Sequence, residues 1–236
     1  MGDPVIDAYR ARQMQLEKAV QGALNVFFTQ LSDNPATARN QLVAFVPALV
    51  NRYGPVAAEI AVEYYQGAVG DSFFIATPAE SLLAPEHMEK SLRRVAGGLW
   101  AGEHDAVLDA ARGFTGRWVR DYGRATIIHN AKREKVGFAR VPTGGKTCSF
   151  CLIMASRGVV YKSEESAGSA RKFHDHCDCE IIRVGEGEEY PSDYLPDDAL
   201  AMYEHARRSA GSHKIEDITA EMRRLYPESL SDGVIH

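Results

Sequence analysis

The sequence has no long apolar run and very little cysteine, and both shortages narrow the class of protein. No stretch approaches the ~20 apolar residues that a membrane-spanning helix needs. The opening residues, MGDPVIDAYRARQ, lack the apolar segment of a secretory signal. We therefore expect a protein made in the cytoplasm, with no membrane association. Its 236 residues are 45% hydrophobic and 25% charged, so the chain can bury a core of its own.

Several catalytic motifs are also missing. There is no HExxH zinc-protease motif. His129 is the nearest histidine before the first cysteine, and it is not followed two residues later by the glutamate of a zinc deaminase. The stretch TGGKT (143–147) lacks the upstream glycine of a phosphate-binding loop, because residue 140 is arginine. These absences favour a protein that is not an enzyme.

The cysteines that are present lie close together. All four fall within 32 residues, as Cys148-x2-Cys151 and then Cys177-x-Cys179, and His174 precedes the second pair. In a reducing compartment this clustering favours a metal site over a disulfide framework. A thiolate-rich set suits structural zinc, which takes four ligands in a tetrahedron. The five candidate donors are one more than zinc needs, and either His174 or Cys179 could complete the set.

Three alternatives to structural zinc stay open at this point. Disulfides would require an oxidising compartment. A catalytic metal would need an open coordination position, which a closed set of thiolates does not leave. A metal-dependent nuclease built on His174, Asp175 and His176 is the enzyme hypothesis that is hardest to exclude. His176 is the least expected zinc ligand, and we expect its side chain to contact a ligand or the solvent.

Charge is unevenly distributed along the chain. Residues 112–183 carry 14 Lys or Arg against 7 Asp or Glu, a balance of +7, and both flanks are acidic. Such a region can mark contact with DNA or with an acidic partner. Because the basic residues are interleaved with apolar ones, pairing within the chain explains them better. DNA contact through residues 112–183 stays a secondary hypothesis.

Hydrophobic spacing predicts a mostly α protein of the α+β class. Helical periodicity covers residues 9–31, 36–51, 56–68, 86–98 and 104–134. Leu16, Val20 and Leu24 are expected on one face of the first helix, and Asn34 is expected to cap the start of the second. Pro47 should kink or shorten the second helix, and the stretch YGP (53–55) should break the chain again. Strands are expected at 136–142 and 180–184, a short helix between them, and helices near 193–210 and 214–225. We divide the chain into a helical domain of hairpins or a bundle (1–134), a small zinc-stabilised α/β module (135–184), and an acidic linker with helices and tail (185–236).

One region of the sequence resembles a known family. The stretches RVPTGGKTCSFC, ASRGVVY and HDHCDC occur in that order between Arg140 and Cys179. They are similar to the pattern R-V-P-x-G-x-x-C-x-F-C, A-S-R-G-x-V-Y and H-x-x-C-x-C. That pattern is found in the MuF-like head morphogenesis (minor capsid) proteins of tailed phages, in particular those of actinobacteria. The likeness is specific over residues 137–184.

The resemblance implies a minor structural protein of a phage head. Such proteins are thought to associate with the portal or the major capsid protein and to enter the procapsid in few copies. The expected location is the virion, at the capsid interior or the portal vertex, after synthesis in the host cytoplasm. The short form implies no catalytic activity. Longer relatives carry fused protease or toxin domains, and we expect none in this chain.

Overall fold

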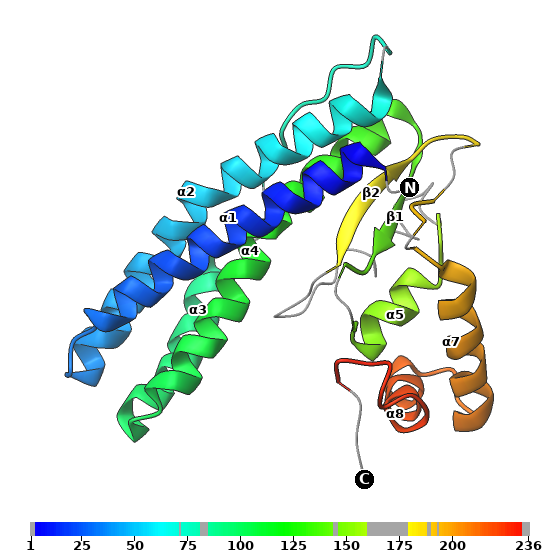
Figure 1. Cartoon of the computed structure of the whole chain (residues 1–236). Coiled ribbons are helices and arrows are strands. Elements are labelled where there is room, and N and C mark those ends of the chain that lie inside the picture. Colours follow the sequence, from blue (N-terminus) through cyan, green and yellow to red (C-terminus); the bar gives the residue numbers. More distant parts are fainter. Residues whose placement is uncertain are drawn as a thin grey trace. The chain divides into compact units, whose positions relative to one another are not determined.

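A computed structural model describes residues 3–70, 72–80, 85–143, 146–159, 179–187, 190–192 and 194–232. Its elements are α1 (Pro4–Thr29), α2 (Pro35–Val69), α3 (Pro85–Val95), the 3-10 helix η1 (Ala96–Ala101), α4 (His104–Glu134), β1 (Gly137–Val141), α5 (Ser149–Ala155), β2 (Glu180–Val184), α7 (Pro196–Ala210) and α8 (Ile215–Leu225) (Figure 1). The predicted class, mostly α with a small β component, is confirmed.

The chain divides into two compact units. We call residues 4–130 the helical unit, and the described residues between 131 and 232 the mixed unit. In the described part of the chain, no helix combines the length and the apolar character required to cross a membrane.

In the helical unit, α1 and α2 form an antiparallel hairpin (Figure 1). The predicted apolar face of α1 is confirmed, since Leu16, Val20 and Leu24 are all buried. The predicted cap at the start of α2 is confirmed as well. The Asn34 side chain accepts a hydrogen bond from the Thr37 amide at 3.0 Å, and a proline follows the cap.

The predicted break at residues 53–55 is wrong, and Pro47 does not shorten the helix. α2 runs without interruption from Pro35 to Val69 and contains both Pro47 and Pro55. An interior proline costs about 3 kcal/mol because it removes a backbone hydrogen bond. Full burial of one Val or Leu side chain contributes about 1.5–3 kcal/mol. α2 buries a whole side of such residues, including Leu42 and Val46, so packing outweighs the two prolines.

Glycines bring α4 close to α2. A Cβ atom on Gly54 would lie 2.4 Å from the ring of Tyr122, and one on Gly123 would lie 3.1 Å from the carbonyl oxygen of Ala57. In the sequence, the glycines within 104–134 weaken the helical pattern, yet α4 is continuous over that range. Gly123 of α4 and Gly54 of α2 are the residues whose small size permits this close helix packing.

The segment after α2 is an extended strap, residues 72–80, held by side chains. Asn130 of α4 accepts from the Thr77 amide at 3.0 Å and donates to the Thr77 carbonyl at 2.8 Å. Thr126 accepts from the Ala79 amide at 3.0 Å. From α2, the Gln66 amide group bonds the backbone of the strap in the same two-sided way. These bonds satisfy backbone groups that have no strand or helix partner.

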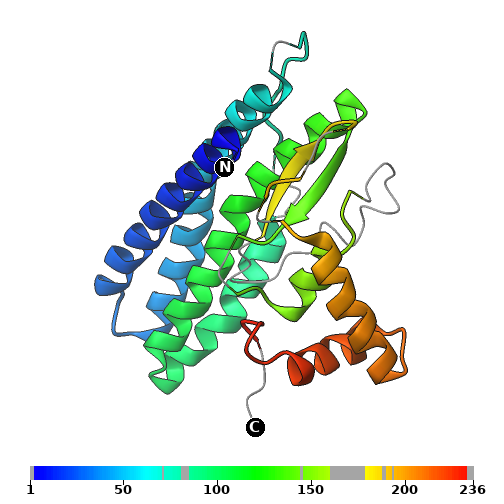
Figure 2. The ribbon, with the colours of Figure 1, turned by 45° about the vertical axis from the view of Figure 1, so that its right-hand side comes forward.

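The mixed unit contains a two-stranded antiparallel sheet. β1 pairs with β2 from Gly137↔Val184 to Val141↔Glu180, and Figure 2 shows the two strands side by side from a second angle. Both strands match their predicted positions. A separate apolar cluster joins α5 to α7 and α8 through buried residues such as Ile153, Ala206 and Met222. The short helix therefore packs on the last two helices of the chain.

The end of α4 has an unusual residue for its conformation. Lys135 has φ 64°, in the left-handed region. The Val136 amide donates to the Ala131 carbonyl at 3.0 Å, and the Lys135 amide donates to that of Lys132 at 3.3 Å. This pair of bonds defines a helix end at which glycine is usual, because a side chain is strained there.

We expect Lys135→Gly to stabilise the mixed unit. Relief of the left-handed strain, less the added entropy of a glycine in the unfolded chain, should raise the free energy of unfolding by about 0.5–1 kcal/mol. Thermal unfolding measures this as an increase of a few degrees in Tm. The matched control is Lys132→Gly, one helical turn earlier, which should lower stability. A Tm decrease for Lys135→Gly would contradict the argument.

Candidate metal centre and its surroundings

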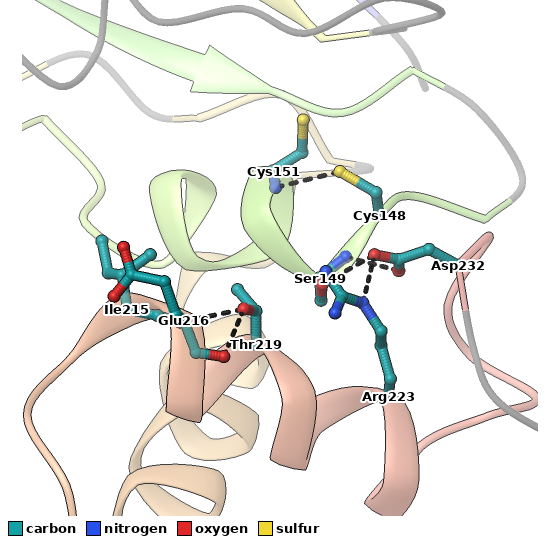
Figure 3. A network of polar contacts seen from close by, with 8 residues as sticks. All are labelled: Cys148, Ser149, Cys151, Ile215, Glu216, Thr219, Arg223 and Asp232. Carbon is teal, nitrogen blue, oxygen red and sulfur yellow. Dashed lines mark hydrogen bonds and ion pairs between the residues drawn. The ribbon is translucent and has the colours of Figure 1, made fainter.

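The first two cysteines lie at the N-terminus of α5. Cys148 is the residue before the helix, with φ −76° and ψ 157°, and its Sγ accepts a hydrogen bond from the Cys151 amide at 3.3 Å. Figure 3 shows both side chains at this end of the helix. The partial positive charge of a helix N-terminus favours a negatively charged sulfur. The CxxC spacing thus forms a local turn that is suited to thiolate ligands.

A buried arginine contacts the second of these cysteines. Arg140 of β1 is completely buried, and its Nη2 donates a hydrogen bond to Cys151 Sγ at 3.2 Å. Its guanidinium carbon lies 5.7 Å from the centre of the Phe150 ring. A buried cation beside a sulfur stabilises the sulfur in its negative form. We did not predict this role for Arg140, although an arginine inside an otherwise apolar strand was a usable signal.

Cys179 is the third described cysteine, and it is fully buried immediately before β2. The register Val141↔Glu180 places it at the end of the sheet where β1 leads on toward Cys148. None of these three cysteines forms a disulfide. Among the described residues, no three His, Cys, Asp or Glu side chains are close enough together to hold a metal ion.

Two of the predicted ligands, His174 and Cys177, lie outside the described residues, as do Asp175 and His176 of the nuclease hypothesis. The structure thus brings Cys148 and Cys151 together in one turn. The complete ligand set stays a prediction.

The start of α5 is also held by an aspartate from the end of the chain. Asp232 Oδ1 accepts from the Ser149 amide and Oδ2 accepts from the Ser149 hydroxyl, both at 2.8 Å. Arg223 of α8 donates from Nε to Oδ2 at 2.8 Å (Figure 3). Burial acts to raise the pKa of Asp232, but the hydrogen bonds from Arg223 and Ser149 outweigh it, so the pKa lies below 3.8. This carboxylate therefore contributes stability above its unfolded pKa, and the contribution is lost as pH falls through the folded pKa.

Several described basic residues of the 112–183 region have partners within the same unit. In the helical unit, Arg120 pairs with Glu17 at 2.5 Å, and Arg112 donates to the Asn25 side chain at 2.6 Å. In the mixed unit, Arg183 makes two hydrogen bonds to Glu134. Pairing inside the chain thus accounts for Arg112, Arg120 and Arg183, and for the remaining basic residues it stays a prediction.

Comparison with known proteins gives the family. A family described as VG15 protein matches residues 3–206, which is most of the chain and includes both units. The chain belongs to the VG15 family. The match extends well beyond the cysteine-containing stretch, so the helical unit is part of the family likeness too.

A curated relative of this VG15 family member is a phage protein. It is the Gene 15 protein of Mycobacterium phage D29, at 28% identity, and the aligned part covers 48% of this chain and 57% of the phage protein. The chain therefore spans little more than half the length of that relative. No solved structure gives a significant match. The expected membership of a phage protein family is confirmed, and the narrower MuF-like assignment stays a prediction.

Proposed function

We propose that this VG15 family member is a non-enzymatic minor capsid protein of a tailed phage, acting in head morphogenesis. It would associate with the portal, the major capsid protein or both, and be carried in the virion. The observation that carries the proposal is the family match over residues 3–206 together with a relative from a mycobacterial phage. The motif resemblance over residues 137–184 adds the narrower MuF-like assignment.

Structural zinc is the second part of the proposal. Cys148 and Cys151 would supply two ligands, and two of His174, Cys177 and Cys179 would complete the set. Two contacts support a metal site at these cysteines. The Cys151 amide donates a hydrogen bond to Cys148 Sγ, and the Arg140 guanidinium donates one to Cys151 Sγ. A zinc ion here would supply folding free energy, on the order of 10 kcal/mol for structural sites. That is a large contribution to a unit with a two-stranded sheet.

Fractionation of phage assembly products tests the capsid role. A tagged copy of the chain, expressed during infection by its phage, should appear in procapsids and virions at a few copies per particle. It should also copurify with the portal or the major capsid protein. Quantitative mass spectrometry of gradient-purified particles measures both. Recovery only in the particle-free fraction would contradict the proposal.

Metal analysis of the purified chain tests the zinc site, and it should find about one zinc per chain.

A DNA-binding or nuclease role is the alternative. Its support is the +7 balance of residues 112–183, but several of these basic residues already have partners within their own unit. If DNA were bound through this region, affinity would fall steeply with salt. If a nuclease were present, His176→Ala would abolish metal-dependent cleavage and leave the fold intact. DNA affinity that does not change with salt would contradict the DNA-binding role. The absence of cleavage with any divalent metal would contradict the nuclease role.

A further inference from the structure

Residues 230–232 lie against the residues that precede and begin α5, and we call them the clasp. Leu230 forms a parallel β-bridge with Thr147 and is almost fully buried. The Ser231 amide donates to the Thr147 carbonyl at 3.0 Å. Asp232 then bonds the amide and the hydroxyl of Ser149. Leu230 thus pairs with Thr147 in the bridge, and Ser231 and Asp232 hydrogen-bond to the two residues that flank Cys148.

These contacts fix the backbone on both sides of Cys148. The direction of the Cys148 side chain depends on the dihedral angles of residues 147–149, because this residue is not itself inside the helix. Thr147 is held by the clasp backbone and Ser149 by the Asp232 carboxylate. The Cys148 Sγ is therefore presented to the Cys151 amide by a backbone that the clasp holds in place.

The clasp is itself anchored at a distance from the cysteines. Arg223 of α8 donates to the Asp232 carboxylate, and the Leu230 side chain belongs to the apolar cluster that joins α5 to α7 and α8. The position of the cysteine turn is thus linked to the last helix of the chain by one charged contact and one apolar contact.

We infer that the clasp is a positioning device for the Cys148–Cys151 metal pair, and that metal binding and clasp docking stabilise each other. The inference rests on the proposed zinc site. Coupling between two events is reciprocal in free energy. A metal at the turn should therefore hold the clasp in place, and loss of the clasp should weaken metal binding. A partner that captured residues 230–232 would loosen the metal site in the same way.

Zinc affinity of the full chain tests this inference. Zinc binding is measured by competition with a chromophoric chelator for the wild-type protein, Asp232→Ala and Arg223→Gln. Substitution of a residue that orients a metal ligand typically lowers metal affinity 10- to 100-fold. We expect zinc binding to weaken about tenfold in Asp232→Ala, and less in Arg223→Gln. The matched control is Asp217→Ala, which removes a similar hydrogen bond from the Ser212 hydroxyl at the start of α8. Its zinc affinity should equal that of the wild type.

Amide hydrogen exchange distinguishes coupling to zinc from a purely structural role of the clasp, because a purely structural clasp would exchange at the same rate with and without zinc. In the wild type, zinc should slow exchange of the Ser231 and Ser149 amides, because both donate in the clasp contacts. In Asp232→Ala the slowing at Ser231 should be much reduced. The inference is overturned if the wild type binds zinc but the variants bind it equally well and Ser231 does not respond. If the wild type binds no zinc, the metal site and the clasp's coupling to it are both wrong.

Discussion

Cys148→Ser is expected to unfold the mixed unit and leave the helices of residues 4–130 folded. A structural zinc contributes on the order of 10 kcal/mol to folding, and most single domains are stable by only about 5–15 kcal/mol. With zinc bound as proposed, loss of one of its four ligands should therefore cost the unit most of its stability. Circular dichroism should show a helical signal that melts separately, and near-UV signals and exchange protection in the mixed unit should be lost. A single joint collapse would show that the two units unfold cooperatively.

The choice of serine separates metal loss from loss of a helix cap. Serine is one of the preferred residues at a helix N-cap, and its hydroxyl can accept the Cys151 amide as Cys148 Sγ does. If Cys148 served only as a cap, the substitution would be nearly neutral. A strong chelator provides the matched control, since it should destabilise the wild type and have no further effect on Cys148→Ser. A neutral substitution would remove the zinc proposal. Parallel tests of His174→Gln and Cys179→Ser identify which residue completes the set.

Glu134→Ala is expected to destabilise the mixed unit by about 3 kcal/mol, the range for breaking a buried ion pair. Arg183 donates to the two Glu134 oxygens at 2.7 and 2.5 Å, and the two side chains are only 7% and 15% exposed. The substitution removes the carboxylate that accepts these two bonds. Glu134 also lies at the C-terminus of α4, where a negative charge costs about 0.3–1 kcal/mol. Removing that penalty offsets only a minor part of the loss.

Two comparisons make the Glu134→Ala prediction specific. Glu204→Ala breaks the exposed pair with Arg208 on α7 and should change stability by less than about 0.5 kcal/mol. The double variant Glu134→Met with Arg183→Met should recover most of the loss, because apolar replacements avoid leaving one buried charge. Denaturant unfolding of each variant gives the free energies. Equal losses for Glu134→Ala and Glu204→Ala would contradict the distinction between buried and exposed pairs.

The helices and strands were largely predictable because their signals are local. The spacing of Leu16, Val20 and Leu24 and the cap at Asn34 are both confirmed. The continuity of α2 was not predictable from the same local rules. Whether Pro47 and Pro55 interrupt a helix depends on what the rest of that helix buries, and this is decided by packing against distant segments. The same holds for Gly123 of α4, since a glycine weakens an isolated helix but permits the close approach of α2.

The local turn that joins Cys148 to Cys151 was predictable from the CxxC spacing, but the residues that contact it were not. The sequence places Arg140 eleven residues before Cys151, and Asp232 lies 83 residues after Ser149. The first contact comes from the packing of α5 against β1, and the second from the return of the chain after α8. Neither relation leaves a periodic or spacing signal in the sequence. Contacts between segments far apart in the sequence are therefore harder to predict than a local turn.

The 72–80 strap affects how readily the protein would aggregate at high concentration. Phe73 is fully exposed, and Ile75 is 72% exposed, so the segment presents two apolar side chains to solvent. Extended chains of this kind readily add strands from neighbouring molecules through unused backbone groups, which leads to aggregation. Here the amide groups of Gln66 and Asn130 already occupy backbone groups of the strap. The strap can thus expose apolar side chains at high local concentration while offering fewer backbone groups on which an aggregate could grow.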